Sequence, residues 1–191
     1  MPGIQQLLAD LVGPDENLAE AAATALAREG NTAVPALLGL LSSTDPDHRW
    51  WALRALAALP DPPVPAFIKS LADCEVEVRS AAALALAAHP DPRSLPALVQ
   101  LLNDQDQLAG LLAVRALVRI GDAAVPSLME AFENAPRNGQ IHMLRAFTEL
   151  RDPRTIGLLM RALQRDSAVM QYWAQRALEG LGLDMVYLRL D

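Results

Sequence analysis

The chain has 191 residues, of which 52% are hydrophobic, and its formal net charge is −7. This acidic excess argues against a general polyanion-binding protein, which normally carries a basic surplus. No apolar stretch approaches membrane-spanning length, and no basic segment precedes an apolar run near the amino end, so we expect a soluble, cytoplasmic protein. A single cysteine, Cys74, excludes an intramolecular disulfide and fits a reducing compartment.

The first 29 residues predict a divergent helical hairpin. Apolar spacing favours a short helix over residues 2–11 and a second helix over residues 17–28. Gly13-Pro14-Asp15 separates the two, because glycine and proline interrupt helices. Gly30 suits the carboxyl end of the second helix.

Residues 60–89 form the clearest helix–turn–helix unit in the sequence. Asp61-Pro62-Pro63 predicts a turn, and Pro65 suits the first turn of a helix, where a missing N–H is tolerated. We expect helices over residues 66–72 and 78–88, with the acidic segment Asp73-Cys74-Glu75 between them.

The second helix of this unit has one apolar face, rich in alanine, which should pack closely against neighbouring helices. The residues expected on that core face are Val78, Ala82, Ala85, Leu86 and His89. A rotation of about 100° per residue directs Ser80, Leu84 and Ala87 away from the core.

The same unit recurs along the chain, with boundaries at residues 30–59, 60–89, 90–120, 121–150 and 151–181. One position of the repeat holds a proline or glycine throughout: Pro35, Pro65, Pro96, Pro126 and Gly157. A fixed period of this size indicates a solenoid, because one helical hairpin cannot bury its apolar face alone. We therefore expect a single domain over residues 1–191, in which the tail 182–191 caps the last repeat or, alternatively, mediates self-association.

The sequence VRSAAALAL at residues 78–86, following an acidic turn in a unit opened by proline, resembles the HEAT-like repeats of the phycobilisome-lyase type. This resemblance implies an all-α fold, a right-handed α-α superhelix of about six helical hairpins. Repeats of the family often pair an acidic turn residue with an arginine, a pattern matched by Asp73, Arg79 and Arg49. The family includes scaffolds, chromophore-lyase subunits and regulators. The equivalents of Arg79 in the later repeats depart from the pattern; they are Gly110, Gln140 and Gln171.

The sequence contains no recognisable catalytic or metal-binding motif. His48, His89 and His142 lie in three different repeats, without the spacing of a zinc site. The neighbours of Cys74 are acidic, which does not activate a thiol. The sequence therefore predicts that the chain is not an enzyme and needs neither a metal nor a cofactor.

In four of the five regular repeats, the face of the second helix opposite the core carries the same pair of residue types. A large apolar residue is followed four places later by an arginine, and these two positions adjoin on a helix. The apolar members are Trp50, Leu111, Ile141 and Tyr172, and the arginines are Arg54, Arg115, Arg145 and Arg176. Trp, Tyr and Arg are the residue types most enriched among binding hot spots, so we expect these eight residues to line a concave groove.

The favoured function is a non-catalytic scaffold that binds an acidic or mixed acidic and apolar segment of another protein in this groove. One alternative is a chromophore-lyase-subunit or chaperone-like role on a chromoprotein, which the family resemblance allows. A second is nucleic-acid binding through the arginines, with bases stacked on the aromatic residues. We expect no membrane partner, and a monomer or a weak homo-oligomer formed through the termini.

Overall fold

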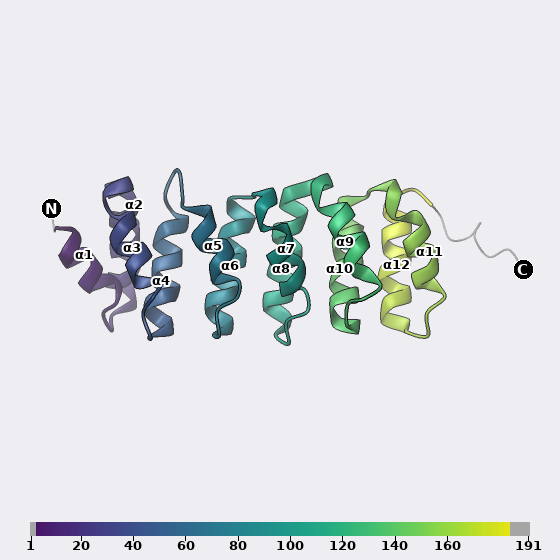
Figure 1. Cartoon of the computed structure of the whole chain (residues 1–191), viewed down its shortest axis with the longest axis horizontal. Helices are drawn as coiled ribbons and strands as arrows, with labels where there is room; N and C mark the ends of the chain where they lie inside the picture. Colours follow the sequence, from purple (N-terminus) through teal and green to yellow (C-terminus); the bar gives the residue numbers. More distant parts are fainter. Residues whose placement is uncertain (1–2, 184–191) are drawn as a thin grey trace, which may run out of the picture. The chain divides into compact units, whose positions relative to one another are not determined.

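The computed structural model describes residues 3–183, which divide into two compact units between His89 and Pro90. Within the described residues all regular secondary structure is helical, and each unit consists of three helical hairpins (Figure 1). The predicted all-α fold of about six hairpins is thus confirmed. The division into units does not test the predicted single domain over 1–191, which stays a prediction.

In the first unit each hairpin pairs a shorter helix with a longer one. The three hairpins are α1 (Ile4–Leu11) with α2 (Glu16–Glu29), α3 (Val34–Leu40) with α4 (Pro46–Ala57), and α5 (Val64–Ser70) with α6 (Val76–Ala88). The longer helices α2, α4 and α6 pack in succession, α4 between the other two. The helices predicted within residues 1–29 and 60–89 are therefore present, with ends shifted by one or two residues.

Aspartate side chains cap the starts of α2 and α4. The Asp15 carboxylate accepts hydrogen bonds from the Asn17 and Leu18 amides at the start of α2, and Asp45 does the same for the Asp47 amide of α4. Such caps satisfy amide groups that have no partner inside the helix. Gly30, with a φ of 59°, ends α2.

The core of α6 is broader than the apolar stripe predicted from the sequence. Four of the five predicted core residues, Val78, Ala82, Ala85 and Leu86, are buried. Leu84 is exposed as expected, but Ala87 is only 5% exposed, and the prediction that it points away from the core is wrong. Ala83 lies four residues earlier on the same face and is fully buried. Within its unit α6 packs against both α4 and α5, so more than one side of the helix is covered.

His89 occupies the end of α6 and is half-buried rather than part of the core. Its Nε2 lies 2.8 Å from the carbonyl oxygen of Ala57, the last residue of α4. The histidine predicted as a core residue therefore links the ends of two successive longer helices, because the backbone turns out of the helix at this position.

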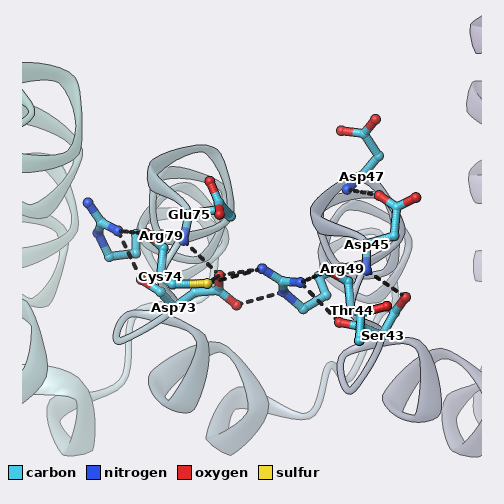
Figure 2. A network of polar contacts seen from close by, with 9 residues as sticks. All are labelled: Ser43, Thr44, Asp45, Asp47, Arg49, Asp73, Cys74, Glu75 and Arg79. Carbon is cyan, nitrogen blue, oxygen red and sulfur yellow. Dashed lines mark hydrogen bonds and ion pairs between the residues drawn. The ribbon is translucent and has the colours of Figure 1, made fainter.

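A buried ion pair joins the second and third hairpins (Figure 2). The Arg49 guanidinium donates from Nε and Nη2 to the two carboxylate oxygens of Asp73, over 2.8 and 2.7 Å. Its Nη1 donates to the carbonyl oxygens of Ser43 and Thr44, in the turn before its own helix. Burial alone would raise the pKa of Asp73, but hydrogen bonds from Arg49 and the Glu75 amide outweigh burial and hold this pKa below its usual range.

The position of Arg49 has a common structural role in four of the hairpins. Arg79 donates to the carbonyl oxygens of Asp73 and Cys74, both over 2.9 Å. In the second unit Gln140 donates to the Phe132 carbonyl oxygen and Gln171 to that of Arg165. Glutamine at these two positions therefore still donates to a carbonyl oxygen at the end of the preceding helix or in the turn after it.

The second unit repeats the arrangement of the first. Its hairpins are α7 (Leu95–Leu101) with α8 (Gln107–Ile120), α9 (Ala124–Phe132) with α10 (Arg137–Leu150), and α11 (Ile156–Leu163) with α12 (Ala168–Gly180). The shorter helix of each is preceded by a single 3-10 turn, at Pro92–Ser94, Gly121–Ala123 and Pro153–Thr155. The helix α10 packs against both α8 and α12.

Two glycines let α10 lie close to the preceding hairpin, Gly110 against α8 and Gly139 against the turn between α7 and α8. A Cβ atom at Gly110 of α8 would lie 2.6 Å from Nε2 of His142, a fully buried residue of α10. A Cβ atom at Gly139 of α10 would collide with the Asn103 amide oxygen. Gly110 replaces the arginine of the earlier repeats because His142 fills the space that a side chain there would need.

None of the helices in residues 3–183 is long and apolar enough to cross a membrane. The predicted capping tail, residues 182–191, falls almost wholly at 184–191, outside the described residues. Its proposed roles, and the predicted cytoplasmic location, stay predictions.

Two candidate binding grooves

The second unit contains a groove of about 670 Å³ between α8, α10 and α12, which we call the arginine groove. It brings together four of the predicted site residues, Leu111, Arg115, Arg145 and Arg176. Arg119 and Trp173 line it as well. Leu111 is 40% exposed, so the groove offers apolar surface beside its cations.

Trp173 is the aromatic residue of this groove, and it was not among the predicted site residues. The Arg145 guanidinium lies 4.7 Å from the centre of the Trp173 ring, close enough for a cation–π interaction. The Arg145 Nε is buried and has no hydrogen-bond partner among the described residues. The predicted Tyr172 is 55% exposed and lies edge-on to Trp173 at 5.1 Å, but neither Tyr172 nor Ile141 lines the groove.

The arginine groove is strongly basic although the whole chain is acidic. Four guanidinium groups line it, and Glu149 is the one carboxylate among its lining residues. Their proximity concentrates positive potential on a small surface, which attracts anions. This unit therefore contains a basic and apolar groove with four of the eight predicted residues in its lining. That the eight residues form one partner-binding groove stays a prediction.

The first unit contains a second groove, of about 880 Å³, which we call the tryptophan groove. Its aromatic surface comes from Trp50 and Trp51 of α4, whose rings meet edge-on with centres 4.8 Å apart. The predicted residues Trp50 and Arg54 both line it, whereas Trp51 was not predicted. The sequence signal that could have found both missed tryptophans is their shared repeat position, one residue after Trp50 and Tyr172.

The tryptophan groove has the opposite charge to the arginine groove. Arg54 donates from Nη2 to both carboxylate oxygens of Glu20, over 2.7 and 2.6 Å. Five carboxylates line the groove against this one arginine; they are Glu16, Glu20, Asp45, Asp47 and Glu77. Arg54 is thus already paired, and its surroundings favour cations.

The histidines and the cysteine do not form a reactive centre. Among residues 3–183 no three His, Cys, Asp or Glu side chains are grouped so as to hold a metal ion. His48 contacts Ser43 and Asp45, and Cys74 lies beside the Arg49 guanidinium. His142 is fully buried with both ring nitrogens unpaired in the described structure, and burial, reinforced by the charge of Arg145, lowers its pKa.

The sequence matches the family model of HEAT repeats over residues 3–73 and again over 64–139. The chain belongs to the HEAT-repeat family. A similar protein is the bilin biosynthesis protein RpcF of Synechococcus sp. (strain WH8020), 31% identical over 74 residues. This match spans 39% of the HEAT-repeat chain and 35% of the length of RpcF.

Solved helical-repeat structures share the fold. One similar chain comes from the complex of CpcE and CpcF of phycocyanin lyase from Nostoc sp. PCC7120. It is 24% identical to the HEAT-repeat chain with a TM-score of 0.59, and the match covers 75% of the HEAT-repeat chain and 96% of the solved one. A designed armadillo repeat protein in complex with the peptide (KR)4 is 18% identical with a TM-score of 0.54, over 94% and 100% of the two chains. These likenesses establish a HEAT- and armadillo-like solenoid fold, as predicted.

The comparisons confirm the resemblance to HEAT-like repeats of the phycobilisome-lyase type, and they correct one prediction. The expectation that the chain is not an enzyme is wrong, because its relative RpcF is a bilin biosynthesis protein and a similar solved complex belongs to a phycocyanin lyase. The expectation had rested on the lack of a self-contained catalytic motif. That criterion fails for a repeat protein, whose function resides in an extended surface and in its complexes.

Proposed function

We propose that this HEAT-repeat protein is a component of a bilin lyase, acting with a protein partner on the linkage between a bilin and a chromoprotein. The observation that carries this proposal is the 31% identity to a bilin biosynthesis protein over 74 residues. The similar solved structure is a complex of two different chains, CpcE and CpcF, which supports the requirement for a protein partner. Of the functions predicted from the sequence, this alternative is better supported than a scaffold.

The arginine groove is the proposed contact site for the bilin. A bilin is an open-chain tetrapyrrole, a conjugated and largely apolar molecule that bears carboxylate groups. Arg115, Arg145 and Arg176 supply planar guanidinium groups, which pair well with carboxylates. Trp173 and Leu111 supply the apolar surface. A volume of about 670 Å³ lies within the range of small-molecule sites.

In this proposal the predicted residues have different roles. Leu111, Arg115, Arg145 and Arg176 contact the bilin directly, and Tyr172 borders the site through its contact with Trp173. Ile141 is half-buried on α10 and supports the helix packing. Trp50 and Arg54 belong to the other groove and take no part in binding the bilin.

The test has a binding arm and a transfer arm. A free linear tetrapyrrole such as biliverdin is titrated into the protein while its visible absorbance and the tryptophan fluorescence are followed. Arg115→Gln with Arg145→Gln should weaken binding by about tenfold, since an ion pair of an exposed or half-buried arginine contributes about 1 kcal/mol. The matched control is Arg28→Gln with Arg161→Gln, which removes the same charge from exposed residues outside the groove.

In the transfer arm the protein is incubated with a bilin, an apo-chromoprotein and a second lyase chain. Bilin bound covalently to the chromoprotein is then measured as absorbance that survives denaturation. Omission of the HEAT-repeat protein should reduce the rate of attachment. Equal rates with and without it would refute the lyase role, and equal affinity in the two arginine pairs would place the bilin elsewhere.

A further inference from the structure

The tryptophan groove already holds one guanidinium group, that of its own Arg54. The Arg54 guanidinium carbon lies 5.4 Å from the centre of the Trp50 ring and 5.8 Å from that of Trp51. Both distances are within the range of cation–π attraction. Glu20 completes the arrangement from α2, accepting hydrogen bonds in both of its carboxylate oxygens. Arg54 therefore shows, within the chain itself, how indole rings and a carboxylate of this groove hold an arginine side chain.

Three other carboxylates of the groove are not paired with a cation in the described structure. Glu16, Asp47 and Glu77 line it, are exposed, and have no cationic partner within residues 3–183. Asp47 and Glu77 occupy the same position in successive hairpins, in the first turns of α4 and α6. In addition to Glu20, the aligned repeats therefore place Asp47 and Glu77 in the lining of the tryptophan groove. A chain segment that crosses the hairpins could contact them in succession.

We infer that the tryptophan groove is a docking site for an arginine- or lysine-bearing segment of a partner protein. Charge complementarity identifies the occupant, because five carboxylates face one arginine here, whereas the arginine groove presents four arginines and one carboxylate. The two grooves therefore select ligands of opposite charge. Arginine is the preferred residue of the segment, since it can stack on an indole and pair with a carboxylate at once.

The chain offers a direct optical test of this inference. It has three tryptophans, Trp50, Trp51 and Trp173, so in Trp173→Phe the tryptophan fluorescence comes only from the tryptophan groove. This variant is titrated with a tetra-arginine peptide and, in parallel, with a tetra-glutamate peptide. The arginine peptide should give a saturable change in fluorescence that weakens as salt is added, and the glutamate peptide should give none.

Substitutions then locate the binding. Asp47→Asn with Glu77→Gln should weaken the affinity for tetra-arginine by about fivefold or more, as expected for the loss of two exposed ion pairs. The matched control is Glu29→Gln with Asp61→Asn, which removes the same charge from exposed positions of the first unit outside the groove. Unchanged melting temperatures in both pairs exclude unfolding as the cause.

Three results would overturn the inference. One is the absence of a saturable change with tetra-arginine. Another is an equal loss of affinity in the groove and control pairs, which would reduce the binding to the general acidity of the chain. The third is concentration-dependent self-association, measured by light scattering, that is abolished by either double variant. The two double variants are Asp47→Asn with Glu77→Gln and Arg115→Gln with Arg145→Gln. This result would make a second copy of this chain the occupant. None of these experiments contains a bilin, so their outcome is independent of the proposed lyase role.

Discussion

Replacing Arg49 by methionine should lower the free energy of unfolding by about 3 kcal/mol. The Arg49 side chain is 9% exposed and that of Asp73 is 14% exposed, so the substitution leaves a largely buried carboxylate without its cation. Breaking one side of a buried ion pair costs about 3 to 5 kcal/mol. We take the lower end, because Asp73 keeps the hydrogen bond from the Glu75 amide and the Ser43 and Thr44 carbonyl groups can turn to water. Methionine retains the apolar stem of arginine, so the loss reports the charged contacts.

The measurement is unfolding in urea, monitored by circular dichroism, with Arg54→Met as the matched control. Arg54 and Glu20 form an ion pair with side chains 44% and 53% exposed, which contributes at most about 1 kcal/mol. A double-mutant cycle with Asp73→Asn isolates the interaction of Arg49 with Asp73. Similar losses for Arg49→Met and Arg54→Met, or additive losses within the cycle, would refute the view that the buried pair ties the second hairpin to the third.

Two further predictions concern the core. His142 binds a proton less readily when folded, so its stabilising contribution should be complete above its ordinary pKa of 6.5 and should be lost as the pH falls below that value. His142→Leu should therefore flatten the decline of the melting temperature in acid, and an unchanged decline would contradict the prediction. Ala85→Leu should cost about 1 to 3 kcal/mol by overpacking the face of α6, whereas Ala88→Leu, at an exposed position of the same helix, should cost little. Equal melting temperatures for these two variants would mean that the core face of α6 is assigned wrongly.

The hairpins could be predicted because their signals are local. Pro65, the acidic turn at Asp73 and the alanine spacing of α6 each act within one helical hairpin, where sequence distance and spatial distance agree. Only some of the residues that line the two grooves were predicted, because charge pairing connects residues far apart in the chain. The sequence aligned Arg54 with Arg115, but not Glu20 with Arg54, which lie 34 residues apart and in different hairpins. Trp51 and Trp173 were missed because the prediction followed only the positions of Trp50 and Tyr172, whereas the residue after each of these lines a groove.

The fit of His142 against Gly110 limits how this repeat protein can have evolved. Tandem arrays lengthen and shorten by duplication or loss of whole units, which works only while any unit accepts any neighbour. A copy of residues 121–150 placed after a unit with arginine at the Gly110 position, such as 60–89, would drive its histidine into that side chain. The contact between Asn103 and Gly139 restricts the same junction a second time. The junction of α8 with α10 is therefore inherited as a matched pair, and a chimera that exchanges one partner alone should fold less well than one that moves both.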